Sequence, residues 1–406
     1  MPIYHTLGNV PHKRHTQFRR PDGKLYTEQL MGSRGFSGRS SLIYHHNMPT
    51  QAREIRKIQD CRVTYADEQT LRHHHFKTKD LKKSGDPVSG RVTLLHNNDV
   101  SMAIAVPDQT MTYYYRNGQG DDMYFVHEGT GRIQTIFGEL HYRPGDYVVI
   151  PRGTTYMFHP DPGAQRYLVI ESASSIETPK RYRNEYGQLL EHSPFTKRDI
   201  RKPERLETIT DKGTYEVRIK ARDQITAYEF DFHPLDVVGW DGYLYPYIFN
   251  IEDFEPITGR IHMPPPTHQC FEGRNFVVCS FVPRLYDYHP DALPVPYNHS
   301  NIDSDEVLYY VNGNFMSRRG IEVGSFTLHP SGIPHGPQPG LAEKSIGMTE
   351  THELAVMCDT FHPLRLTKLA KELDDGKYAY SWYEEPDAVK EATNADEDPA
   401  GVTSHF

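Results

Sequence analysis

The 406-residue sequence predicts an all-β fold in which two jelly-roll barrels are repeated along one chain. Glycine and proline each occur 30 times and tyrosine 27 times, a composition typical of many short strands joined by turns. Strand-like runs alternate with glycine turns between residues 90 and 175, and again between residues 250 and 362. This regular spacing favours a barrel or sandwich over a layered α/β fold.

Two stretches of the first β-rich block align with stretches of the second, each without an internal gap. Residues 115–129 align with residues 299–313, and residues 145–156 align with residues 324–335. Identical residues recur at matching positions, namely Asn117 and Asn301, Asp121 and Asp305, Gly129 and Gly313, Gly145 and Gly324, Pro151 and Pro330, and Gly153 and Gly332. The repeat predicts a duplicated domain.

Composition divides the chain into five expected parts. These are an N-terminal arm that packs on the barrels (1–90), an N-terminal barrel (91–175), a connecting segment (176–249), a C-terminal catalytic barrel (250–383) and a mobile acidic tail (384–406). The connecting segment contains a long charged stretch, which predicts a linker over the surface. Leucine and alanine at helical spacing in PLRLTKLAKEL predict a short C-terminal helix.

Charge and hydropathy exclude several classes of protein. Lysine and arginine number 45 against 54 aspartate and glutamate, a net charge of −9 that disfavours binding to nucleic acid or to an anionic membrane. No uncharged apolar run approaches the ~18 residues of a membrane span. The basic N-terminus has no apolar segment behind it, so we expect no signal peptide. Four cysteines without a CxxC pair predict free thiols in a reducing, cytoplasmic setting.

Histidine is abundant, with 23 residues, and most of these are expected to be ordinary core or surface residues. The run His73–His75 lies in a charged stretch, LRHHHFKTKD. Three consecutive side chains cannot share one face of a strand or helix. A solvated run is therefore expected there rather than a metal site.

The duplicated blocks resemble the two motifs of the cupin family. The run from Gly324 to His335 meets the second cupin motif at every position. The run from His299 to Gly313 fits the first motif, except that Asn301 stands where the motif has its second histidine. The resemblance implies a duplicated cupin, a double-stranded β-helix of two barrels.

The match to the two cupin motifs gives three candidate metal ligands, His299, Glu306 and His335. On neighbouring strands of a small barrel they would project inward and offer two imidazoles and one carboxylate. Such a set leaves coordination positions open and suits non-haem Fe(II), whereas a structural zinc site has four protein ligands.

The N-terminal copy differs at all three ligand positions. It has Tyr115, Asp122 and Tyr156 there, a poor set for a divalent metal. We expect this half to be a scaffold that binds no metal.

Longer stretches resemble the homogentisate 1,2-dioxygenase family in order and spacing, over nearly the whole chain. They are LYTEQLMGSRGFSG, FVHEGTGRIQTIFGELHYRPGDYVVIPRGTTY, FEGRNFVVCSFVPR, PVPYNHSNIDSDEVLYYVNGNF and HPSGIPHG. The resemblance implies a bicupin whose C-terminal half holds Fe(II), and which opens homogentisate with O2 to give maleylacetoacetate during tyrosine and phenylalanine degradation. It also implies a homo-oligomer, a trimer or a hexamer.

The resemblance carries the family's iron ligands onto the three residues already selected. A further family histidine falls on His329, which implies a hydrogen bond to substrate or oxygen. The family's acid/base histidine lies in a segment that aligns poorly, where RIHMPPPTHQCF offers His262 and His268. We take His268, His262 and His329 as candidates for the proton acceptor, because an imidazole can titrate near neutral pH. The alternative for the first two is a loop histidine that caps turns among the prolines.

Three further residues are candidates for the substrate pocket. Tyr297 precedes the first ligand and either lines the pocket or packs beside it, and Asn301 is expected to hydrogen-bond behind the ligands. The family's active-site tyrosine corresponds to Phe315 here, so another para-diol (gentisate, hydroquinone or a substituted homogentisate) stays open as substrate. For Arg274 and Arg284 we expect surface ion pairs.

Two functions of other classes also fit a cupin. One is a non-catalytic, metal-binding bicupin of the pirin kind, and the other is a metal-dependent isomerase that works without O2. Oxygen uptake with a diol separates both from a dioxygenase.

Overall fold

The computed structural model describes residues 3–67, 70–295, 297–312, 315 and 317–383. Strands dominate these residues and the helices are short, which confirms the predicted all-β fold with two cupin barrels. The predicted tail, residues 384–406, lies outside the described residues. In the described part of the chain, no helix has the length and apolar character needed to cross a membrane.

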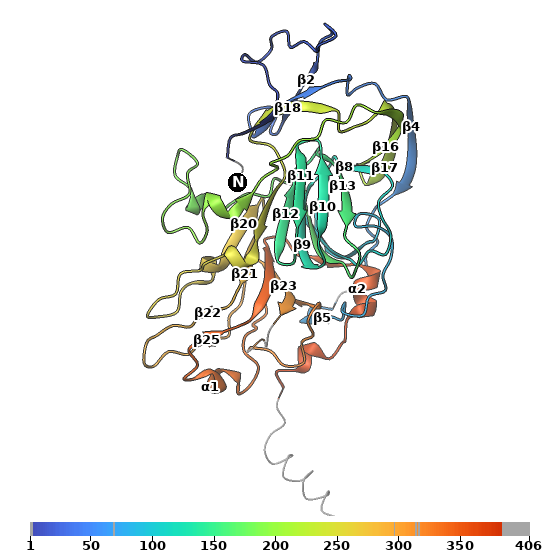
Figure 1. Cartoon of the computed structure of the whole chain (residues 1–406). Coiled ribbons are helices and arrows are strands. Elements are labelled where there is room, and N and C mark those ends of the chain that lie inside the picture. The colour runs from blue at the N-terminus through green and yellow to red at the C-terminus, as the bar shows by residue number, and fades with distance from the viewer. Residues whose placement is uncertain (1–2, 68–69, 296, 313–314, 316, 384–406) are drawn as a thin grey trace, which may run out of the picture.

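The N-terminal barrel is built from a seven-stranded and an eight-stranded sheet (Figure 1). The first has the order β11 (Gly138–Tyr142), β10 (Gly131–Thr135), β13 (Thr155–Pro160), β8 (Tyr114–Asn117), β16 (Lys212–Ala221), β17 (Gln224–Phe232) and β4 (Glu54–Asp60). The second has the order β15 (Ile200–Arg201), β19 (Tyr247–Asn250), β12 (Asp146–Ile150), β9 (Asp121–Glu128), β14 (Arg166–Ser172), β7 (Val100–Ala105), β6 (Arg91–His96) and β27 (Arg365–Leu366). Tyr115, Tyr156 and Val169 belong to the hydrophobic cluster that fills this barrel.

The C-terminal barrel is built on a six-stranded sheet. Its order is β20 (Gln269–Gly273), β21 (Phe276–Phe281), β26 (Leu354–Thr360), β23 (Asp305–Asn312), β24 (Phe326–His329) and β5 (His74–Phe76). A two-stranded sheet pairs β22 (Arg284–Leu285) with β25 (Glu350–Thr351). Strand β5 comes from the N-terminal arm and completes the edge of this sheet beside β24 (Figure 1).

The N-terminal arm forms most of a fourth sheet. It has the order β1 (His5–Gly8), β18 (Val237–Gly242), β3 (Ser40–His45) and β2 (Thr27–Gly32). Residues 176–249, for which the sequence predicts a connecting segment, also contribute strands β15 to β19 to the three N-terminal sheets. In β16 and β17, charged side chains hide the strand pattern, because only occasional residues, such as Val217, Ala227 and Phe230, are buried.

Helices are short and lie in the connections. They are α1 (Leu341–Ser345), α2 (Lys368–Leu373) and the 3-10 turns η1 (Lys180–Tyr182), η2 (Lys197–Asp199), η3 (Ile251–Asp253), η4 (Pro265–His268) and η5 (Tyr378–Tyr380). Helix α2 is the predicted C-terminal helix, and it begins after Thr367, whose hydroxyl accepts from the Ala370 N–H at 3.1 Å. The four cysteines are free, as predicted.

The internal repeat is visible in the backbone. Gly145 and Gly153 in the first copy have φ values of +84° each, and Gly324 and Gly332 in the second have +80° and +82°. Glycine adopts this left-handed conformation without steric cost, so both copies turn into and out of the equivalent strand in the same way.

The two barrels pack against each other through strand β23. On its outward face, Tyr309 approaches the Phe125 ring at 6.5 Å and hydrogen-bonds through its hydroxyl to Nδ1 of His127 at 2.7 Å. Phe125, Tyr309 and Val356 belong to one buried cluster that joins both barrels. Successive strand residues face opposite ways, so Glu306 on the same strand is directed into the C-terminal barrel.

A candidate metal centre in the C-terminal barrel

Three chain segments bring one carboxylate and two imidazoles together. Glu306 lies on β23, and its register partners are His329 on β24 and Asp359 on β26, so all three face the barrel interior. His299 and His335 lie on loops joined by an isolated antiparallel bridge, in which each backbone N–H donates to the other's carbonyl at 2.8 and 2.9 Å. The expectation of ligands on neighbouring strands therefore holds for Glu306, whereas loops carry the two histidines.

The donor atoms of His299, Glu306 and His335 lie within 4.8 Å of one another. Nε2 of His335 is 3.3 Å from Oε1 of Glu306, and Nε2 of His299 is 3.8 Å from Oε2. Both ring nitrogens of His335 and Nδ1 of His299 are buried without a hydrogen-bond partner among the described residues. Buried polar atoms need partners, so this donor set fits a bound metal cation.

Access to the cluster is from one side. The His299 side chain is 36% exposed, whereas that of His335 is 1% exposed. A metal held here would therefore be open to small molecules on the His299 side.

Behind Glu306, a chain of hydrogen bonds fixes the carboxylate. Oε1 of Glu306 lies 2.7 Å from Nδ1 of His329, and Nε2 of His329 lies 2.9 Å from the Tyr378 hydroxyl. Nε of Arg318 donates to the same hydroxyl at 3.1 Å. Both nitrogens of His329 therefore bond to protein groups, an arrangement that positions Glu306.

The electrostatics of the cluster favour a cation. Burial alone would raise the pKa of Glu306, but the imidazoles of His299, His329 and His335 hold it well below its usual range. Burial lowers the pKa of His329 to about 3, so this ring is neutral. Burial and then the charge of Glu306 raise the pKa of Asp359 well above its usual range. The cluster thus combines an ionised Glu306 with a neutral His329.

The run His73–His75 is buried, so the expectation of a solvated run is wrong. Strand β5 carries His74 and His75 and pairs with β24. An aspartate contacts each of these two histidines. Nδ1 of His74 is 2.8 Å from Asp374, and Nδ1 of His75 is 3.2 Å from Asp375. Pairing with distant carboxylates gives these side chains buried partners that the local sequence does not reveal.

His73 lies next to the candidate metal centre. Its ring centroid is 5.3 Å from that of His329, 5.9 Å from that of His335 and 5.1 Å from that of Trp382. Its Nε2 is 3.1 Å from the Pro334 carbonyl. The N-terminal arm therefore supplies one wall of the site.

Two predicted residues form an outer row on the open side. The Tyr297 ring lies 5.9 Å from that of His299 and 5.2 Å from that of His262. Nδ1 of His262 is 3.5 Å from the Asp287 carboxylate. The Tyr297 ring thus contacts both His262 and His299, and His262 is one ring further from the cluster than His299.

His268 lies apart from the three ligands. It is the last residue of η4 and packs on Phe281, with ring centroids 4.6 Å apart. Burial, followed by the charge of Arg284, lowers its pKa to about 3. Arg284 itself pairs with Glu353 at 3.0 Å, the ion pair that the sequence predicts.

The remaining candidates have modest contacts. The Asn301 carbonyl accepts from the Gly332 N–H at 2.9 Å, which ties the two motif loops together. The Phe315 ring lies 4.4 Å from that of Tyr310. Arg274 donates its backbone N–H to Ser174.

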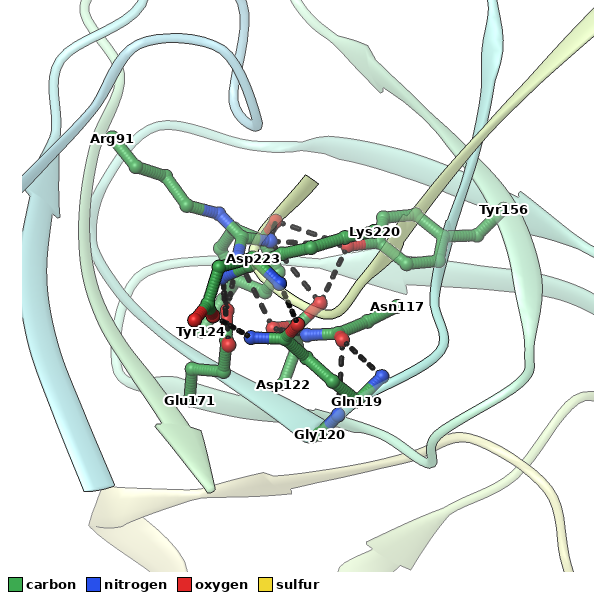
Figure 2. Close-up of polar contacts among 10 residues, drawn as sticks. All are labelled: Arg91, Asn117, Gln119, Gly120, Asp122, Tyr124, Tyr156, Glu171, Lys220 and Asp223. Carbon is green, nitrogen blue, oxygen red and sulfur yellow. Dashed lines mark hydrogen bonds and ion pairs between the residues drawn. The ribbon is translucent and has the colours of Figure 1, made fainter. Parts of the chain in front are cut away.

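In the N-terminal copy, a guanidinium stands where the other barrel offers a metal site (Figure 2). Asp122 accepts from both terminal nitrogens of Arg91 at 3.1 Å, from Asn117 at 3.0 Å and from the Tyr156 hydroxyl at 2.9 Å. Tyr115 packs edge-on against Tyr156 at 5.5 Å. The absence of metal from this half stays a prediction, and the engagement of Asp122 supports it.

Sequence reasoning missed three residues of the centre, namely Arg318, Tyr378 and Trp382. Nε1 of Trp382 donates to the Gly336 carbonyl at 3.1 Å, and Arg318 lies 5.4 Å from its ring centroid. They lie outside both cupin motifs, so spacing could not select them. The one local signal is the segment KYAYSWY, shortly after α2, which is rich in aromatic residues and contains Tyr378 and Trp382.

Comparison with known proteins identifies relatives over most of the chain. The family model described as "Homogentisate 1,2-dioxygenase N-terminal" matches residues 7–251. A protein of Saccharolobus solfataricus, provisionally named a dioxygenase, is 43% identical over 94% of this chain and 100% of its own. A homogentisate 1,2-dioxygenase of Bradyrhizobium diazoefficiens is 27% identical over 66% of this chain and 62% of its own. Among solved structures, a cupin 2 conserved barrel domain protein from Leptotrichia buccalis covers 74% of this chain and 100% of its own at 10% identity, with a TM-score of 0.32 that supports no inference.

Proposed function

This chain belongs to the homogentisate 1,2-dioxygenase family, and from that membership we propose that it is an Fe(II)-dependent, ring-cleaving dioxygenase. The proposed reaction opens homogentisate with O2 to give maleylacetoacetate, which retains both oxygen atoms. One observation carries the proposal, namely the open set of two imidazoles and one carboxylate in the C-terminal barrel. Two histidines and a carboxylate are typical of non-haem Fe(II) oxygenases.

His299, Glu306 and His335 would hold the metal. Bound Fe(II) would supply adjacent coordination positions at which the diol and O2 are held together. The protein's own contribution is orientation, because Arg318, Tyr378 and His329 keep the carboxylate fixed.

We assign the uptake of the substrate's hydroxyl proton to His262. A proton acceptor works best with a pKa near the working pH, and burial lowers the pKa values of His268 and His329 to about 3. His262 is half-exposed, and its Nδ1 lies 3.5 Å from the Asp287 carboxylate, which orients the ring. Tyr297 lies between His262 and His299, on the side where substrate would enter.

Phe315 favours a second candidate, a different para-diol. A phenyl ring on Tyr310 offers no hydroxyl to a polar substituent, unlike the tyrosine that the family resemblance implies at this place. Gentisate, hydroquinone or a substituted homogentisate would then be the substrate of the same metal centre.

The test is oxygen uptake by protein loaded with Fe(II) under anaerobic conditions, with homogentisate, gentisate and hydroquinone in parallel. We expect uptake with homogentisate and the absorbance of an opened, enolic product. His335→Ala and Glu306→Ala should lose iron and uptake while keeping the circular dichroism spectrum, and His352→Ala, a change at an exposed histidine, should keep both.

The other outcomes separate the alternatives. Uptake with a different diol alone would keep the iron site and change the substrate. No uptake by any diol, despite bound iron, would favour a non-catalytic, metal-binding bicupin.

The proposal includes a homo-oligomer, a trimer or hexamer. This expectation follows from the family resemblance alone. Size-exclusion chromatography with light scattering tests it, and a monomer at micromolar concentration would contradict it.

A further inference from the structure

A second cavity lies in the N-terminal barrel, apart from the metal centre. Its volume is about 220 Å³. It opens between β6, β7 and β14 of one sheet and the β16–β17 hairpin of the other, and Arg91, Ser101, Glu171, Arg218 and Lys220 are among its lining residues. The proposed reaction makes no use of this space.

The cavity opens on the position that corresponds to the metal centre of the other barrel. Tyr115, which aligns with the ligand His299, is one of its lining residues. Arg91 also lines it and holds Asp122, which aligns with Glu306 (Figure 2). A fixed guanidinium thus lies at the floor of a pocket whose counterpart is the site of the proposed chemistry.

The charged groups in and beside the cavity form two ion-pair clusters. In the first, Arg91 pairs with Asp122 and Glu171, and Lys220 pairs with Glu171, so two cations balance two carboxylates. In the second, Glu216 pairs with both Arg218 and Arg56, which leaves one net positive charge. An anion with a single negative charge, bound at Arg218, would balance the second cluster.

Two cations that line the cavity, Lys220 and Arg218, also have hydrogen-bond donors that no described protein group uses. Lys220 bonds both oxygens of Glu171, at 2.7 and 2.6 Å, which uses two of its three N–H groups. Among the described residues, Arg218 bonds only through Nε, to Glu216 at 2.6 Å, while its guanidinium lies 3.7 Å from the Tyr113 ring centroid. Its two terminal nitrogens therefore remain available for a bidentate acceptor.

Part of the remaining wall is apolar. Val88, Ala103, Val169 and Ile225 line the cavity beside the charged groups. We propose that this cavity binds a small organic monocarboxylate, whose carboxylate group meets Arg218 and Lys220 and whose apolar body lies against this wall. A pocket with a few placed polar groups in an apolar lining is typical of small-molecule sites. The inference rests on the N-terminal barrel and is independent of the proposed reaction.

The test uses benzoate as the probe and benzamide as its neutral counterpart. Binding to the full chain is measured by isothermal titration calorimetry and by saturation-transfer NMR. We expect benzoate to bind about tenfold or more tightly than benzamide, because only the carboxylate can accept a charge-assisted bidentate bond. Equal binding of the two probes, or no benzoate binding at millimolar concentration, would overturn the proposal.

Variants locate the site. Arg218→Gln removes the free guanidinium, and Ser101→Phe fills the cavity without changing its charge, so each should weaken benzoate binding by about tenfold or more. Arg53→Gln is the matched control, because this half-exposed arginine pairs with Glu229 on the same sheet but does not line the cavity. His335→Ala controls for binding at the metal centre.

Arg53→Gln and His335→Ala should leave benzoate binding to the cavity unchanged. Benzoate binding that survives both cavity variants, or that His335→Ala abolishes, would show that the probe binds elsewhere. Thermal midpoints of all variants separate loss of binding from loss of fold.

Discussion

At the residue scale, the two barrels differ in what faces their inward carboxylate. Asp122 meets the guanidinium of Arg91, a permanent cation, so its charge is already compensated. Glu306 instead meets the imidazoles of His299, His329 and His335, and no arginine or lysine is paired with it among the described residues. The same strand position therefore serves structure in one barrel and is a candidate metal ligand in the other.

Tyr378→Phe tests how Glu306 is positioned. The change removes the hydroxyl that joins Arg318 to His329 and leaves a buried imidazole nitrogen without its partner. Iron affinity or turnover should fall by about tenfold to hundredfold, the usual effect of losing a residue that orients a metal ligand. Iron titration followed by oxygen uptake measures both quantities.

The neighbouring Tyr380→Phe is the control for that change, since Tyr380 is 72% exposed. It should behave as the unchanged protein does. Wild-type iron affinity and turnover in Tyr378→Phe would show that the hydrogen-bond chain has no functional role.

His262→Gln tests the proton acceptor. Glutamine keeps a polar side chain but cannot take up the substrate's proton, so kcat should fall by about a hundredfold or more while iron stays bound. Unchanged turnover would remove His262 from the mechanism, and His352→Gln supplies the matched exposed control.

The candidate ligands could be selected from the sequence because each motif lies within one strand and its flanking loops. His299, Glu306 and His335 could be selected by spacing and are the three that the fold brings together. Tyr378 and His73 could not, because they reach the centre from opposite ends of the chain. No local sequence pattern predicts that these two residues lie beside the same centre.

At the element scale, strand β5 shows how a wrong expectation arises. Taken alone, the run His73–His75 in a charged stretch is typical of a surface. Its partners Asp374 and Asp375 lie about three hundred residues further on, at the end of α2, and they pair with the strand only after folding. The glycine-bounded strands, by contrast, could be predicted because turn and strand signals are adjacent.

Asp374→Asn tests how this strand is held. Burial opposes ionisation of Asp374, but His74 and Arg72 outweigh it and hold its pKa below the usual value. Loss of the charge should lower the free energy of unfolding by about 1–3 kcal/mol, measured by urea denaturation at pH 7. Asp374 stabilises the fold only while it is ionised, and an aspartate in the unfolded chain takes up a proton near pH 4. The difference in the free energy of unfolding between the wild type and Asp374→Asn should therefore shrink as the pH falls below about 4. Asp291→Asn, at a side chain that is 91% exposed, should have no effect, and an equal loss there would contradict this role.

At the scale of the whole molecule, the two barrels form one body because the outward face of β23 packs on the first barrel. The sequence predicts two barrels but not this contact, since nothing in the strand patterns around Tyr309 and Phe125 shows that these two rings meet. His127 is the polar element of the contact. Burial, and then the charge of Arg166, lower its pKa from 6.5 to about 4.

This contact predicts how stability depends on pH. The unfolded chain takes up a proton on His127 near pH 6.5, whereas the folded chain does so only near pH 4. The free energy of unfolding should therefore be greatest above pH 6.5 and fall as the pH is lowered, by up to about 2 kcal/mol at pH 5 from this residue. His127→Gln keeps a polar partner for Tyr309 without this titration, so urea denaturation at pH 7 and pH 5 should show a smaller loss in the variant. His352→Gln, at a side chain that is 77% exposed, should keep the wild-type loss. If His127→Gln loses as much stability as the wild type, protonation at the contact between the barrels does not govern the acid sensitivity of the fold.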